Sequence, residues 1–68
     1  MYSITINNRR MGLKPHNFAS ACEMASHQVS FAGDKELAAK IRECMHRPPI
    51  TGRVHFSGLV KVTIARER

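Results

Sequence analysis

The 68-residue chain has few aromatic side chains, three Phe and one Tyr with no Trp, so we expect an aliphatic core. Its two Cys lack any secretory context and are expected to be reduced thiols, because disulfide frameworks belong mainly to secreted chains. Residues 1–8 contain no apolar region typical of a signal peptide. No stretch approaches the ~18 apolar residues that a membrane span needs. These absences predict an intracellular, cytoplasmic protein.

Acidic residues are also scarce, with five Asp and Glu against eleven Lys and Arg, which gives a net charge of +6. For a chain this small, such an excess favours phosphate, an acidic protein face or an anionic membrane as partner. Seven of the eleven basic residues are Arg. Arg is suited to bidentate phosphate and base contacts, whereas Lys would serve equally well on a merely solvated surface. The composition therefore favours a polyanionic partner over simple solubility.

The sequence contains no signature of an enzyme, such as a Gly-rich phosphate loop, a paired acidic motif or a nucleophile elbow. The sequence contains four potential zinc ligands in and around the predicted helices: Cys22, His27, Cys44 and His46. Helical residues spaced by five or by two point well apart, whereas zinc ligands must converge. The sequence predicts no catalytic residue, no metal and no cofactor.

The N-terminal segment 2–6 alternates apolar and polar residues, which predicts a half-buried strand. Asn7-Asn8 tolerates positive φ, as a two-residue hairpin loop requires. Residues 9–13 would return as a short second strand; the alternative is a single strand running into a loop, since Gly12 weakens the return.

Two helices are expected next, each with one apolar stripe. Asn17 caps the first helix and Asp34 caps the second, which runs to His46 before Pro48-Pro49 forbid continuation. Phe31, near the end of the first helix, is expected to be buried under the intervening turn. The first stripe comprises Phe18, Ala21, Cys22, Ala25 and Val29, and the second comprises Leu37, Ala38, Ile41, Cys44 and Met45.

The C-terminal part reads as a β-hairpin, with residues 53–56 alternating, Ser57-Gly58 forming a tight turn, and residues 59–64 alternating again. The order of elements predicts one small α+β domain covering residues 1–68. It comprises an N-terminal strand or hairpin, two packed helices and a C-terminal β-hairpin, with sheet and helices as two layers. A chain this short has a marginal core unless a partner adds to it.

The basic residues are concentrated in the second helix and in the turn behind it, with a further pair at the first hairpin. The candidate nucleic-acid-binding residues are Arg9, Arg10, Lys35, Lys40, Arg42, Arg47 and Arg53. Residues 35–56 also resemble the recognition helix and wing of phage excisionases and MerR-type winged helices, through Ile41-Arg42-Glu43-Cys44, Pro48-Pro49, Gly52-Arg53 and Phe56. That resemblance implies a helix in the DNA major groove and a wing on the backbone.

These observations favour a small nucleic-acid-binding accessory or regulatory protein, for example a DNA-binding protein in transcription regulation. The alternative is a protein-binding module, an inhibitor or adaptor, that docks its basic face on an acidic protein. A third possibility is a subunit completed only in a larger assembly. Residues 59–64 form the least charged, most β-prone run, so we expect an exposed edge strand that contributes its Val60, Val62 and Ile64 face to a homodimer.

Overall fold

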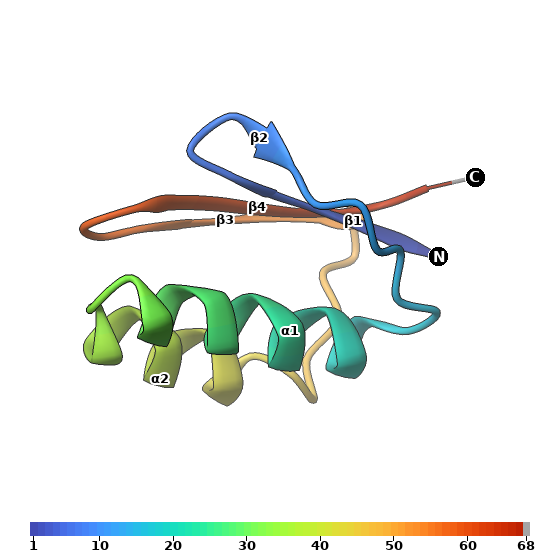
Figure 1. The fold of residues 1–68 in the computed structure, drawn as a ribbon. Coiled ribbons are helices and arrows are strands. Elements are labelled where there is room, and N and C mark those ends of the chain that lie inside the picture. Colours follow the sequence, from blue (N-terminus) through green and yellow to red (C-terminus); the bar gives the residue numbers. More distant parts are fainter. Residues whose placement is uncertain (68) are drawn as a thin grey trace.

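The computed structural model describes residues 1–67 and shows a single layer of two helices packed on one face of a four-stranded antiparallel sheet (Figure 1). This arrangement confirms the predicted α+β class. The elements are β1 (Tyr2–Ile6), β2 (Arg9–Arg10), α1 (Phe18–Phe31), α2 (Lys35–Glu43), β3 (Arg53–Ser57) and β4 (Lys61–Arg66).

The strand order is β2-β1-β4-β3, so the chain's first and last strands are paired in the middle of the sheet. Ile4 lies opposite Ile64, and Ile6 lies opposite Val62. The expectation of an edge strand at residues 59–64 is therefore wrong. β4 is central, and its Val62 and Ile64 side chains are 1% and 0% exposed beneath the helices, so this face is not available to a second copy. The edges are β2 and β3.

The first hairpin forms as predicted. Asn7 and Asn8 have φ values of 51° and 67°, as required of the central residues in a two-residue turn between twisted antiparallel strands. The return strand is shorter than expected and ends at Arg10, although the Met11 amide still donates to the Ile4 carbonyl at 2.8 Å. Asn7 also joins this hairpin to β4, because its side-chain oxygen accepts from the Lys61 amide at 3.0 Å.

The inner face of α1 is built largely from small residues, which lets α2 approach closely. Asn17 caps the helix by accepting from the Ser20 amide at 2.8 Å. The predicted stripe is buried, and Ser26 is buried with it. Ser26 is not orphaned, because its hydroxyl donates to the Glu23 carbonyl at 2.8 Å and accepts from Arg42 Nε at 3.2 Å. This contact ties the two helices together.

A tight turn joins the helices and places Asp34 at the start of α2. Gly33 has a φ of 98°, a conformation that favours glycine, and its amide donates to the Ser30 carbonyl. The Asp34 amide donates to the Val29 carbonyl, completing a Schellman motif. Phe31, the last residue of α1, is 96% exposed, so the prediction that Phe31 is buried under this turn is wrong.

The Asp34 carboxylate caps α2 as predicted and also reaches the sheet. It accepts from the Leu37 amide at 3.0 Å and from the Leu59 amide, in the β3–β4 turn, at 2.8 Å. These two backbone donors, Leu37 first, hold the pKa of Asp34 below its ordinary value. One side chain thus connects the helical layer to the C-terminal hairpin.

α2 ends at Glu43 rather than at the predicted His46. The following amides of Cys44, Met45 and Arg47 each donate to a carbonyl three residues earlier, in tightened turns that lead into Pro48-Pro49. β3 then pairs with β4 along its length, so it is a strand of the main sheet. The segment after α2 is therefore no free-standing wing of the winged-helix kind.

We predict that the inner stripe of α2 carries much of the stability. Leu37 is 3% exposed and Ile41 is 0% exposed. Replacing either residue with Ala should lower the free energy of unfolding by roughly 2–5 kcal/mol, because a cavity is left in the core. Lys40→Ala, on the exposed side of the same helix, should change it by less than about 0.5 kcal/mol. Equal losses in urea unfolding would show that the helix faces are assigned wrongly.

A second stability prediction concerns the β3–β4 turn, where Gly58 packs against the start of α2. A Cβ built on Gly58 would overlap Asp34 Oδ2 and lie 3.1 Å from Leu37 Cδ2. Gly58→Ala should therefore lower the free energy of unfolding by about 1–3 kcal/mol through overpacking. Gly12→Ala is the matched control, because a Cβ there meets nothing within 4 Å. Similar thermal denaturation of the two variants would contradict this role for the turn.

Candidate nucleic-acid interface

The face of the sheet turned away from the helices is polar and open (Figure 1). Strand register places four of its side chains directly opposite one another across all four strands. From β2 to β3 these are Arg10, Thr5, Thr63 and His55, which we call the central row. Directly paired residues of antiparallel strands project on the same side, so the central row forms one transverse line.

Two further rows lie on either side of the central row along the strands. One contains Arg53 of β3 opposite Ala65 of β4, and the other contains Lys61 of β4 opposite Ser57 of β3. Rows two residues apart along a strand are separated by ~6.8 Å. Positive charge therefore lies on both sides of the hydroxyl groups of the central row.

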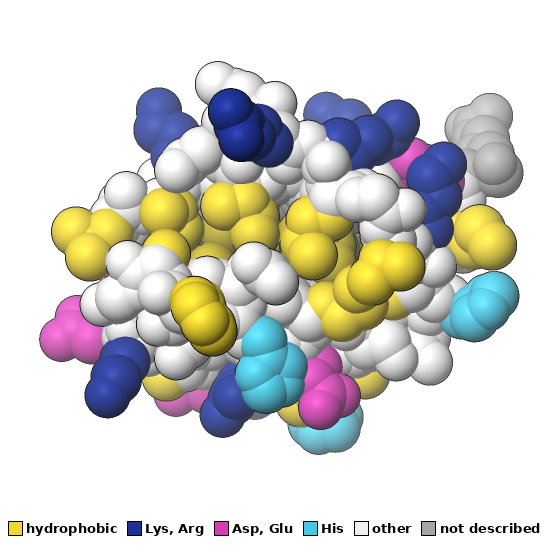
Figure 2. Space-filling model, in the orientation of Figure 1, with side chains coloured by type: hydrophobic (Ala, Val, Ile, Leu, Met, Phe, Trp, Pro, Cys, Tyr) yellow, Lys and Arg dark blue, Asp and Glu magenta, His cyan; other side chains and the backbone are white. Residues whose placement is uncertain are grey.

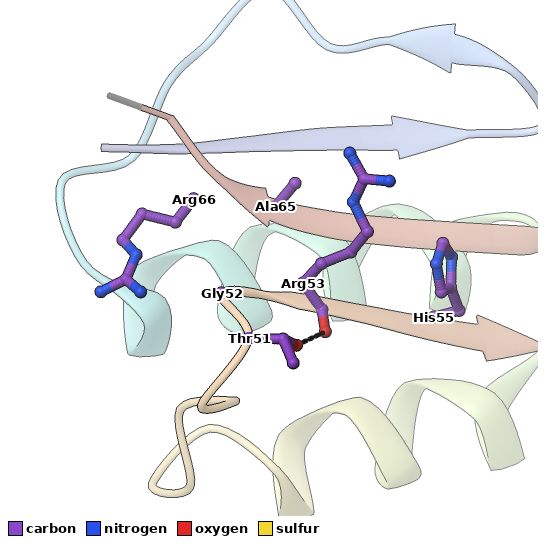
Figure 3. Close-up of a pocket in the computed structure, with 6 residues that line it drawn as sticks. All are labelled: Thr51, Gly52, Arg53, His55, Ala65 and Arg66. Carbon is purple, nitrogen blue, oxygen red and sulfur yellow. Dashed lines mark hydrogen bonds between the residues drawn. The ribbon is translucent and has the colours of Figure 1, made fainter.

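Two hollows flank His55 on this face. The first, of about 480 Å³, is lined by Thr51, Gly52, Arg53, His55, Ala65 and Arg66. Figure 3 shows that the Arg53 side chain extends from β3 across β4, whereas Arg66 points away from it. The second hollow, of about 300 Å³, includes Thr5, His55, Lys61 and Thr63 among its lining residues. The small Thr and Ala side chains of the central strands form the floor between longer side chains.

The net charge of the chain is concentrated in the sheet-forming segments. Residues 17–49, which contain both helices, carry four basic and four acidic side chains and are neutral overall. The remaining residues carry seven basic side chains and one acidic one. Figure 2 shows the consequence in space: Lys and Arg gather on the sheet side, while Asp and Glu lie mainly on the helical side, interspersed with basic residues.

The seven candidate residues of the sequence analysis do not form one surface. Lys35, Lys40 and Arg42 lie on α2, and Arg47 follows it, all in the helical layer beneath the sheet. Arg42 is also used structurally, because it donates to Ser26 of α1. Arg10 and Arg53 lie on the open sheet face, and Arg9, also exposed, is paired with Ile6 at the edge.

Among residues 1–67, a single carboxylate, that of Glu67, lies at one end of the open face. Glu67 forms ion pairs with Arg10 and with Lys14, the latter at 2.9 Å. The hydrogen bond from Lys14, together with the charge of Arg10, holds the pKa of Glu67 below its ordinary value. No carboxylate of residues 1–67 pairs with Arg53 or Lys61. These two cations are therefore the ones left unneutralised on the sheet face.

The Cys and His residues are dispersed through the fold. Burial raises the pKa of the Cys22 thiol to about 11, and the nearby Cys44 adds to this shift, so Cys22 is held in its neutral form. No group of three or more metal-ligating side chains converges among residues 1–67. Within the same residues, neither helix combines the length and apolar content that crossing a bilayer demands.

No known protein family, curated protein or solved structure matches the chain. The assignment of a site therefore rests on the geometry and charge described above.

Sequence reasoning missed Lys61, His55 and the two Thr residues of the central row. Their alternation with buried neighbours places Lys61 and Thr63 on the polar side of β4. That pattern could have identified them as surface residues, but not as neighbours of Arg53, because the strand register and order join segments far apart in the chain.

Proposed function

We propose that this chain binds nucleic acid through the open face of its sheet, as a small cytoplasmic accessory or regulatory protein without a cofactor. The observation that carries the proposal is the charge division: the helical segments are neutral overall, and the sheet-forming segments supply the whole excess of positive charge. Proteins that neutralise phosphates use Lys and Arg gathered on one face. Among the described residues, the open sheet face presents Arg10, Arg53 and Lys61 for such contacts.

The side chains between the cations suit the same ligand. Thr hydroxyls and a His ring can hydrogen-bond phosphate oxygens, and Arg and Lys supply charge. His55 Nδ1 lies 2.9 Å from Thr63 Oγ1, so the central row is already ordered by its own hydrogen bond. A preordered polar face loses less conformational entropy on binding than a flexible basic tail.

The alternative function is a module that docks the same face on an acidic protein, as an inhibitor or adaptor. The basic composition supports both functions, but the spacing of isolated cations around hydroxyl groups favours a ligand with regularly spaced negative charges.

That the protein forms a homodimer also stays a prediction. β4 cannot provide its interface, and β3 is the longer of the two sheet edges left for strand pairing.

A charge-matched pair of double variants tests the proposal. Arg53→Ala with Lys61→Ala should weaken binding to a random-sequence DNA duplex and reduce the slope of log K against log salt by up to about two, one for each lost phosphate contact. Lys35→Ala with Lys40→Ala removes the same charge from the helical layer and should leave both quantities nearly unchanged. Fluorescence anisotropy over a salt series measures them.

The contrary results are distinct. Equal losses from the two double variants would show that net charge, and not the sheet face, determines binding. Absence of any DNA or RNA binding by the wild-type protein at ~50 mM salt, where phosphate contacts are strong, would reject the proposal and favour the acidic-protein alternative.

A further prediction concerns Glu67, which forms ion pairs with two basic residues on the sheet side. Glu67→Gln removes one negative charge and releases Arg10 and Lys14, so it should strengthen duplex binding and steepen the salt slope by about one to two units. Glu43→Gln, at the end of α2, makes the same charge change on the helical side and serves as control. The same anisotropy titrations apply, and unchanged affinity in Glu67→Gln would mean that neither cation reaches the ligand.

A further inference from the structure

We infer, on the basis of the proposed function, that the sheet face binds a single phosphodiester backbone along β1 and β4 and does not read bases. The middle of the face over these strands is made of small side chains, Thr5, Thr63 and Ala65, and Lys61 of β4 lies at one end of it. Longer side chains border it, with Arg10 on β2 and Arg53 and His55 on β3. A recessed face of this kind is complementary in shape to a narrow, convex ligand, such as the sugar-phosphate backbone of a nucleic acid.

The dimensions agree with this orientation. The outer strands β2 and β3 lie three strand spacings apart, roughly 14 Å, so the long side chains that border the floor leave room for one backbone. Along the strands, the Arg53 row, the central row and the Lys61 row follow one another at ~6.8 Å. Each row therefore offers one set of hydrogen-bond donors to successive nucleotides of an extended strand. The first row offers Arg53, the central row offers the Thr hydroxyls and His55, and the third row offers Lys61.

Among residues 1–67, no Phe, Tyr or Trp ring lies on this face for bases to stack on, and the His55 ring is held by its contact with Thr63 Oγ1 at 2.9 Å. Single-strand-binding sheets present aromatic rings on which bases stack. Here Tyr2 packs against Phe18 on the helix side, with ring centroids 5.6 Å apart. Phe56 alternates with His55 and faces the helices, where it packs against the core. Phe31 lies at the end of α1, in the other layer. The bases of a bound strand would therefore point away from the sheet, and binding would be independent of sequence.

Readout by insertion into a groove is also disfavoured by the shape. Proteins that read base edges project a helix or a ribbon into the major groove. On this sheet the small side chains of Thr5, Thr63 and Ala65 lie among the longer ones of Arg10, Arg53, His55 and Lys61, so the middle of the face is recessed and does not project. Arg53 and Lys61 would therefore contact phosphates.

The test uses a single-stranded oligomer of abasic deoxyribose-phosphate units, with oligo-dT and oligo-U of equal length for comparison. The wild-type protein should bind all three within about threefold, because no stacking worth ~1–3 kcal/mol per base is lost when the bases are absent. Loss of tenfold or more on the abasic oligomer, or a tenfold preference between oligo-dT and oligo-U, overturns the inference. In that case the proposed function stands, because the protein still binds nucleic acid.

The hydroxyl groups are tested with the variant Thr5→Val, Thr63→Val, in which Val retains the shape and the strand preference of Thr. Affinity for the abasic oligomer should fall about two- to tenfold, from the loss of uncharged hydrogen bonds, while the salt slope stays unchanged. Ser30→Ala, in the helical layer, is the control and should bind like the wild type. An unaltered affinity in the Thr variant contradicts the backbone path, whereas absence of binding to every oligomer and duplex rejects the proposed function itself.

Discussion

Asp34 joins three parts of this small fold. Its carboxylate caps α2 through the Leu37 amide and accepts from the Leu59 amide in the β3–β4 turn, while the backbone amide of Asp34 completes the Schellman turn after α1. Gly58 must lack a side chain for these groups to meet, because a Cβ would overlap the carboxylate. This contact fixes the C-terminal hairpin over α2, and β4 then pairs with β1. The helices cover the side of the sheet that carries the apolar residues Ile4, Val62 and Ile64, and the Asp34 contact holds the start of α2 against that layer.

Covering one face leaves the other to solvent, and 68 residues cannot supply a third layer. The two helices fit side by side because α1 presents Ala and Ser residues to α2, with Ser26 hydrogen-bonded to Arg42. A sheet face in contact with water favours polar side chains, which accounts for Thr, Ser and His at alternate strand positions. Contact with water alone does not require that the charged side chains be positive. The excess of Arg and Lys over one Glu in the sheet-forming segments therefore needs a different explanation.

Local elements of the fold could be predicted from sequence because their causes are local. The Asn7-Asn8 turn, the two helix caps and the apolar stripes of α1 and α2 each depend on residues within about one or two turns of one another. The position of β4 could not be predicted, because its β-prone composition fits an edge or a centre equally well. Pairing with β1, more than fifty residues earlier, decides it. Phe31 is exposed because it is still part of α1, where a position two residues after the buried Val29 lies ~200° around the helix, on the side away from the core.

The candidate site was even less predictable from the sequence than the position of β4, because it also depends on how distant segments pair. A basic cluster in sequence, from Lys35 to Arg53, is split by the fold between the helical layer and the sheet. The helical segment contains equal numbers of basic and acidic residues, so its electrostatic field falls off over a short distance despite its Lys and Arg content. The sheet segments look less basic along the chain but are almost unopposed. Under the proposed function, a polyanion would approach the sheet face, where Glu67, held by Arg10 and Lys14, is the one carboxylate of the described residues that would compete with its phosphates.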